Sequence, residues 1–158
     1  MKLFVKCGSK YREAEVGEVA EVAHSYQLAE AVCTRMTCDK PLLVYQAIRA
    51  IAHLEHEVFG VCLLDNRKRL IGAEALFRGT LNGAAVYPRE VVRHVMRSNA
   101  ASVIFYHNHP SGTAEPSQAD EMITKSLASA LSMIDVEVLD HLIVGKACYT
   151  SFRERGLL

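Results

Sequence analysis

The segment Val58–Leu64 consists of apolar residues and a single glycine, and it constrains the fold more than any other part of the sequence. Asp65 and Asn66 follow it as a turn signal, and residues 69–77 form a second extended run. A continuous apolar run bounded by turn residues is typical of a buried strand. The two runs therefore predict a hairpin of buried strands.

Three other segments place apolar residues at helical spacing. They are residues 41–55, 88–98 and 117–134. Asp39 is the expected cap of the first helix and Pro41 lies near its first turn, while Pro88 opens the second. Each of these helices has an apolar stripe that needs a partner surface.

Three short apolar segments are expected to be strands. They are residues 102–106, 136–144 and 147–150. Gly145 and Lys146 provide a turn between the last two. The resulting order of helix, hairpin, helix, strand, helix and hairpin predicts one domain of the α/β class, layered in the α+β manner.

The N-terminal part of the chain lacks this strong patterning, because its glutamates are interleaved with valine and alanine. We expect residues 1–38 to form a small extension, with one short strand near residues 2–6 and a second near residues 18–23. Residues 39–158 then form the main domain.

The charges of the chain balance, with 18 lysines and arginines against 18 aspartates and glutamates. No overall field therefore draws the protein to nucleic acid or to an acidic membrane, and any such contact needs a local patch. Arg89, Arg93 and Arg97 lie on one stripe of the second helix and could bind phosphates. A solvated helix face is the simpler explanation and the one favoured.

The five cysteines are odd in number, scattered, and include no C-x-x-C pair, so they suggest neither a disulfide framework nor a thiolate zinc site. The first ten residues contain no signal-peptide core, and no apolar run approaches the length of a membrane span. These features predict a cytoplasmic protein without a membrane partner. Nothing in the sequence indicates an oligomeric state.

The chemically richest segment begins at the end of the predicted strand, with His107 and His109. In an extended chain alternate residues point the same way, and Pro110 favours extended geometry in the residue before it. Both imidazoles can therefore face one point. A turn-rich loop then leads to Asp120, which can supply a third ligand to a catalytic zinc that keeps one position for water.

The same residues have a purely structural explanation. Ser117 and Asp120 spell S-x-x-D, a capping box at the start of the third helix, and an isolated H-x-H is more often accidental than a metal site. The conjunction of H-x-H at a strand end with a helix-start carboxylate is more specific. The letters H-N-H do not make an HNH nuclease, whose residues are dispersed through a larger module.

The pattern made by His107, His109, Ser117 and Asp120 resembles the JAMM signature of JAB1/MPN metalloproteases. The longer sequence motif H-N-H-P-S-G-x-x-x-P-S-x-x-D resembles the RadC-like branch of this family most. Further similarity lies in F-R-G-T at residues 77–80, Y-P-R-E, D-H-L-I-V-G and the C-terminal tail, so that the resemblance covers roughly residues 41–158. It implies a cytidine-deaminase-like central mixed sheet flanked by helices.

The resemblance also implies an activity, the zinc-dependent cleavage of a peptide or isopeptide bond in a protein or peptide substrate. His107, His109 and Asp120 would bind Zn²⁺, Ser117 would stabilise the tetrahedral intermediate, and Glu57 would act as general base.

Glu57 begins E-V-F, which matches the E-x-F pattern of the family at the start of a strand. Glu55 and Glu74 are the nearest alternatives for the base.

Three other histidines are weaker candidates for metal ligands. His53 and His56 near a helix end are better explained as a solvated terminus, and His141, next to Asp140, as a buried residue that supports the site. Two other functions stay open: a DNA-repair-associated or mobile-element accessory protein with an incidental or structural zinc site, and a non-catalytic binding module. The balanced net charge counts against the first, and the filled ligand positions count against the second.

Overall fold

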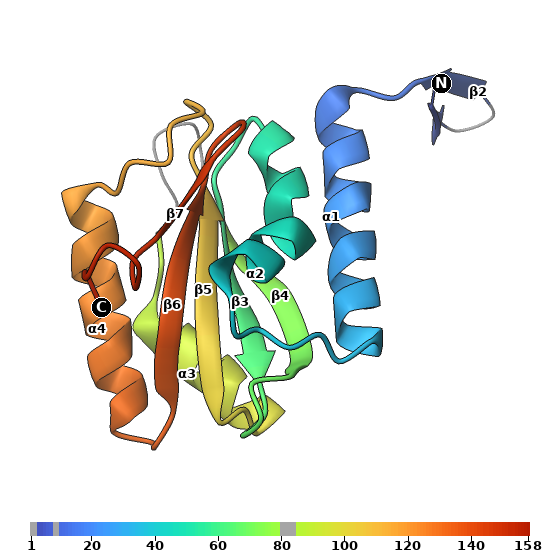
Figure 1. Ribbon diagram of the computed structural model, residues 1–158. Coiled ribbons are helices and arrows are strands. Elements are labelled where there is room, and N and C mark those ends of the chain that lie inside the picture. Colours follow the sequence, from blue (N-terminus) through green and yellow to red (C-terminus); the bar gives the residue numbers. More distant parts are fainter. Residues whose placement is uncertain (1–2, 8–9, 80–84) are drawn as a thin grey trace.

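The computed structural model describes residues 3–7, 10–79 and 85–158 of the chain. Five strands form its central sheet: β3 (Val58–Leu64), β4 (Leu70–Arg78), β5 (Ser102–Asn108), β6 (Glu137–Val144) and β7 (Tyr149–Ser151). Their order is β4-β3-β5-β6-β7 (Figure 1). β5 and β6 pair in parallel and the other neighbours antiparallel, so the sheet is mixed, as expected.

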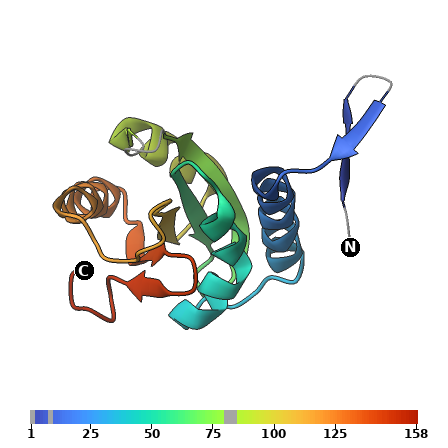
Figure 2. The ribbon, with the colours of Figure 1, turned by 90° about the horizontal axis from the view of Figure 1, so that it is seen from above.

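Helices cover both faces of this sheet, giving three layers (Figures 1 and 2). One face carries α1 (Val16–Cys33), α2 (Pro41–Ile48) and the 3₁₀ helix η1 (Arg49–His53), and the other carries α3 (Pro88–Ser98) and α4 (Gln118–Ser132). The predicted α/β layered class is therefore confirmed. No helix within the described part of the chain is both long enough and apolar enough to cross a membrane.

The two central strands explain the long apolar runs, because all residues of β3 and β5 are buried. Alternate side chains of β5 enter different cores. Ile104 and Tyr106 pack with the α1 and α2 side, while Val103 and Phe105 pack with the α3 and α4 side. Strands that bury both faces consist largely of apolar residues.

The predicted hairpin is confirmed, since β3 and β4 pair antiparallel on either side of a short turn. Asp65 fixes that turn by accepting the backbone N–H groups of Arg67 at 2.8 Å and Arg69 at 3.0 Å. The helix predicted for residues 88–98 also has the observed bounds.

The helix predicted for residues 41–55 is shorter than expected and begins differently. Its α-helical part ends at Ile48, and the chain continues as a 3₁₀ helix to His53. The predicted cap, Asp39, is one residue too early: the N-cap is Lys40, which is extended at φ −127° and ψ 133° and makes no side-chain cap bond. Proline disfavours helical geometry in the residue before it, so Pro41 fixes this start.

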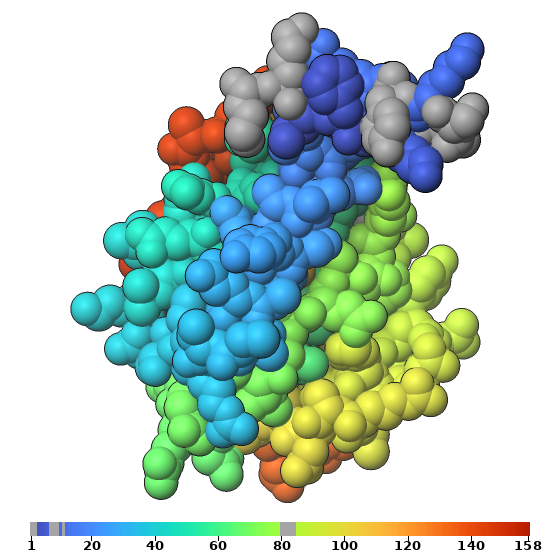
Figure 3. Space-filling view, turned by 90° about the vertical axis from the view of Figure 1, so that its right-hand side faces the viewer, coloured from blue at the N-terminus to red at the C-terminus, as the bar shows by residue number. Residues whose placement is uncertain are grey.

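The second strand predicted near residues 18–23 is wrong, because these residues lie within helix α1. The buried face of α1 consists of Ala20, His24, Leu28 and Ala31, a stripe with too few large apolar side chains to stand out in the sequence. α1 lies across one face of the molecule beside β4 (Figure 3) and packs into the same core as β3 and β5. Tertiary packing, rather than the local sequence pattern, therefore determines that this segment is helical.

The short strand predicted near residues 2–6 corresponds to β1 (Phe4–Cys7), although Lys2 lies outside the described residues. β1 pairs antiparallel with β2 (Lys10–Glu13), and this small hairpin projects beyond α1 (Figure 2). The division of the chain at residue 38 stays a prediction.

Candidate metal centre

Strand β5 and helix α4 bring together the three residues of the H-x-H…D pattern. His107 is 1% exposed near the end of β5, and the backbone N–H of His109 continues the pairing by donating to the Val144 carbonyl of β6 at 3.1 Å. Because alternate residues of an extended chain face the same side, both imidazoles point to one place. Asp120 reaches that place from the first turn of α4.

The three side chains converge closely. The Nε2 atoms of His107 and His109 are 2.9 Å apart. His107 Nε2 lies 3.3 Å from Asp120 Oδ1, and His109 Nε2 lies 3.4 Å from Asp120 Oδ2. The His109 and Asp120 side chains are 17% and 14% exposed, so the cluster is reached from solvent on that side.

A chain of buried hydrogen bonds determines which nitrogen of His107 carries its hydrogen. The Thr124 hydroxyl donates to the Asp120 carbonyl at 2.6 Å, so towards His141 Nδ1, also at 2.6 Å, it can only accept. His141 therefore carries its hydrogen on Nδ1, and its bare Nε2 accepts from His107 Nδ1 at 2.8 Å. The Nε2 lone pair of His107 is left free to face the cluster.

His109 has the same tautomer as His107, and a single hydrogen bond determines it. Its Nδ1 lies 3.1 Å from the Thr113 carbonyl, which only accepts, so this nitrogen carries the hydrogen and Nε2 is bare. Two nitrogen lone pairs and a carboxylate thus converge with no hydrogen between them. Such a set repels itself unless a cation lies among its members, and two imidazoles with one carboxylate suit zinc.

The electrostatics of the cluster agree with this. The Asp120 carboxylate raises the pKa of His109, although burial works in the opposite direction. Burial alone would raise the pKa of Asp120, but His107 and His109 outweigh it and hold that pKa well below its usual range. Burial also lowers the pKa of His141, which stays neutral as the hydrogen-bond chain requires. The Asp120 carboxylate therefore favours positive charge beside it.

The capping box predicted as the structural explanation is present as well. Asp120 Oδ2 accepts the Ser117 backbone N–H at 2.8 Å, and the Asp120 N–H donates to Ser117 Oγ at 3.2 Å. The Ser117 hydroxyl donates to the same Asp120 Oδ2 at 2.6 Å. The helix cap and the cluster are thus made by one carboxylate, and the two explanations do not exclude each other.

Glu57 lies just before β3, at the same end of the sheet. Phe59 is paired with His107 as the last pair of the β3–β5 ladder, and Glu57 lies two residues before Phe59, just beyond that pair. Consistent with this, the negative charge of Glu57 contributes to the raised pKa of His109, after the larger effect of Asp120.

The two alternatives for the base are placed differently. Glu55 is exposed, beyond the end of the strand pairing. Glu74 lies on β4 opposite Val61, one strand further from β5, and its carboxylate is 3.2 Å from His94 of α3. Of the three glutamates, Glu57 is the one whose charge contributes to the raised pKa of His109.

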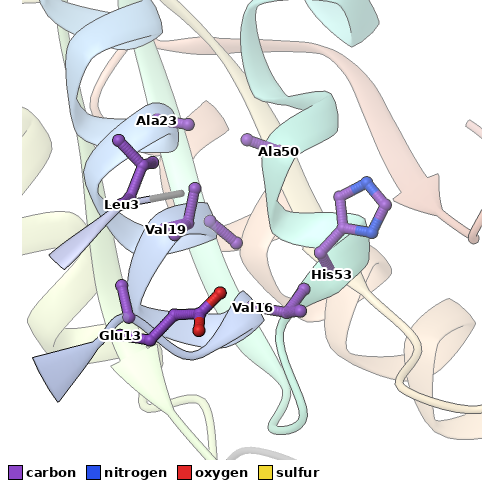
Figure 4. A pocket seen from close by; sticks show the side chains of 9 residues that line it. Leu3, Glu13, Val16, Val19, Ala23, Ala50 and His53 are labelled. Carbon is purple, nitrogen blue, oxygen red and sulfur yellow. The ribbon is translucent and has the colours of Figure 1, made fainter. Parts of the chain in front are cut away.

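The remaining histidines and Asp140 lie outside the cluster. His53 lines a separate hollow of about 370 Å³ between α1, η1 and the N-terminal hairpin (Figure 4). His56 is 3.3 Å from Arg78. Asp140 accepts bonds from Ser151 Oγ at 2.6 Å and from backbone N–H groups, and so holds the strand ends rather than the histidines.

The arginine stripe of α3 is exposed, as the favoured explanation expects. Arg93 forms an ion pair with Glu90, and Arg89 lies 3.6 Å from the same carboxylate. The side chains of Arg89 and Arg93 are 85% and 60% exposed. Glu90 thus offsets part of the positive charge that a phosphate-binding surface needs.

Thr124 carries no motif signal, although its position four residues after Asp120, on the same helix face, could have identified it. We expect Thr124→Val to lower the affinity of the cluster for a metal ion by about 10–100-fold, because it removes the acceptor that fixes His141 and, through it, His107. Competition with a chelator would measure this. The matched control is Thr150→Val, because Thr150 is a buried threonine on β7. Equal losses of metal affinity in the two variants would contradict the expectation.

Comparison with known proteins was consistent with this geometry. The sequence profile described as RadC-like JAB domain matches residues 38–157. A UPF0758 protein of Methylibium petroleiphilum is 48% identical over 148 residues, which are 93% of this chain and 66% of that protein. A UPF0758 protein of Pseudoalteromonas translucida is 59% identical over 105 residues, which are 66% of this chain and 47% of that protein.

The chain thus spans about half to two thirds of the length of these relatives, and their names state no activity. The profile match covers the sheet, the helices around it from α2 onwards, and the cluster of His107, His109 and Asp120. The chain belongs to the RadC-like JAB/MPN domain family.

Proposed function

We propose that this protein is a zinc-dependent hydrolase that cleaves a peptide or isopeptide bond. One observation carries the proposal: the ligand atoms of His107, His109 and Asp120 lie within 4.8 Å of one another. Membership of the JAB/MPN family, which includes hydrolases, supports it.

The chemistry follows from the types of side chain. Zinc held by three protein ligands lowers the pKa of a bound water towards neutrality. Glu57 accepts a proton from the attacking water and passes it to the leaving amine, which needs a carboxylate within hydrogen-bond reach of both. The negative charge of Glu57 helps to raise the pKa of His109, and this closeness to the cluster supports the role.

Ser117 is proposed to donate to the oxyanion that develops on the substrate carbonyl. Its hydroxyl hydrogen is directed to Asp120 Oδ2 in the resting arrangement. The hydrogen must therefore turn from Asp120 to the substrate during the reaction. Rotation about one side-chain bond suffices, because a hydroxyl hydrogen rotates to suit its partner.

The direct test is to purify the protein without added zinc, measure its zinc content, and assay linear peptides and lysine isopeptides before and after chelation. We expect near-stoichiometric zinc, hydrolysis of at least one substrate class, loss of hydrolysis on chelation, and recovery when zinc is returned. Zinc far below stoichiometric, or hydrolysis that survives chelation, would contradict the proposal.

The alternative of a DNA-associated accessory protein makes a different prediction for the same preparation. It requires DNA binding that persists at physiological salt and weakens in Arg93→Ala, because phosphate-driven affinity falls steeply with salt concentration. Such binding without any hydrolysis would favour the alternative.

A further inference from the structure

Asn108, between the two histidines, is fully buried and makes two hydrogen bonds across the sheet. Its Oδ1 accepts the backbone N–H of Val58 at 2.8 Å, and its Nδ2 donates to the backbone carbonyl of His56 at 3.0 Å. These two peptide groups flank Glu57. One side chain therefore spans the segment that carries the proposed base.

The bonds of Asn108 lie where the backbone pairing stops. The ladder between β3 and β5 ends with Phe59 opposite His107, and the Asn108 amide takes over beyond that pair. On the other side, Gly79 donates its N–H to the carbonyl of Glu57 at 2.8 Å. The backbone around Glu57 is thus held from both neighbouring strands, and on the β5 side the holding group is a side chain.

The chemistry of this position calls for a carboxamide. An asparagine side chain offers both a donor and an acceptor, as the Val58 N–H and the His56 carbonyl require, whereas an aspartate has no donor when ionised. A buried peptide group that loses its partner costs free energy, so the bonds resist local opening. His107, Asn108 and His109 are consecutive, so the element that presents the two histidines also holds the glutamate segment.

We propose that Asn108 is a positioning residue that fixes Glu57 relative to the two histidines. The inference rests on the proposed function, because it matters for catalysis only if Glu57 transfers a proton. Small misplacements of a catalytic group reduce rate strongly, by about a hundredfold for a shift of about 1 Å. Asn108 acts through Glu57 and need not touch the substrate.

The test compares Asn108→Ala with Leu139→Ala, a destabilising large-to-small change in the core on β6, which β5 separates from β3. In Asn108→Ala we expect zinc content to be retained, kcat to fall by about 10–100-fold with little change in KM, and the Val58 amide to exchange with solvent at least about tenfold faster. Leu139→Ala should retain kcat and the exchange rate of Val58.

A double variant separates positioning from general damage. In a Glu57→Gln background, Asn108→Ala should lower kcat by less than about threefold, because residues that act as one unit are not additive. Equal losses in both backgrounds, or loss of zinc in Asn108→Ala, would overturn the inference. If Asn108→Ala does not fold, Asn108→Asp carries the same test, since it keeps the acceptor for Val58 and loses the donor to His56.

The two proposals can fail separately. A wild-type protein that binds zinc but hydrolyses nothing would remove the proposed function, and the Val58 exchange rate would still decide whether Asn108 holds the segment. Faster exchange with an unchanged kcat would instead overturn the positioning role and leave the hydrolase standing.

Discussion

Glu57→Gln is expected to leave zinc bound and to lower kcat by about 10²–10⁴-fold, the usual contribution of a positioned general base. Glutamine has nearly the shape of glutamate, so the backbone bonds of the segment should survive, but its amide cannot accept a proton from water. Steady-state kinetics with parallel zinc analysis would measure both quantities.

Two other glutamates serve as controls for this variant. Glu55→Gln and Glu74→Gln should retain kcat within about threefold, because Glu55 is exposed and Glu74 faces His94. An unchanged rate in Glu57→Gln, combined with a large loss in one of the other two, would transfer the role of base to that residue.

Asp120→Asn is expected to abolish stoichiometric zinc binding. It removes the one formal negative charge among the three candidate ligands, and the loss should exceed the roughly 10–100-fold that follows from changes in supporting residues. The asparagine carbonyl can still accept the Ser117 N–H, so most of the helix cap should remain. Competition with a chromophoric chelator would give the affinity.

Ser117→Ala separates the cap of α4 from the metal. It removes the side-chain acceptor of the Asp120 N–H, and a lost cap costs about 1 kcal/mol of stability. Zinc should stay bound in this variant, because serine is not one of the three ligands. Loss of zinc from Ser117→Ala, or retention of zinc by Asp120→Asn, would contradict the assignment of Asp120 as a ligand.

The central sheet was predictable because β3 and β5 are buried on both faces. The apolar run of β3 has the predicted bounds, whereas β5 continues two residues beyond its predicted end at residue 106. Helix α1 was missed for the opposite reason. Its buried stripe contains two alanines and a histidine, and only the packing of His24 near the Tyr106 hydroxyl, at 3.3 Å, shows why these residues face the core.

Some residues of the candidate site were likewise predictable from the sequence, and others were not. His107 and His109 were predictable from strand alternation, and Asp120 was recognised through its spacing and a family resemblance. Asn108 and Thr124 were not, because each acts through a partner distant in sequence. Val58 is 50 positions from Asn108, and His141 is 17 from Thr124. Such partners become visible only when the strands are paired.

The parallel pairing of β5 and β6 has an evolutionary consequence. Two parallel neighbours need a crossover, and here α4 is that crossover, so a single strand–helix–strand unit, residues 102–144, contains all three candidate ligands as well as Thr124 and His141. Glu57 lies outside this unit, before an antiparallel strand. The candidate metal ligands and the proposed base are thus encoded in separate parts of the chain, so a descendant can lose the base and keep the ligands.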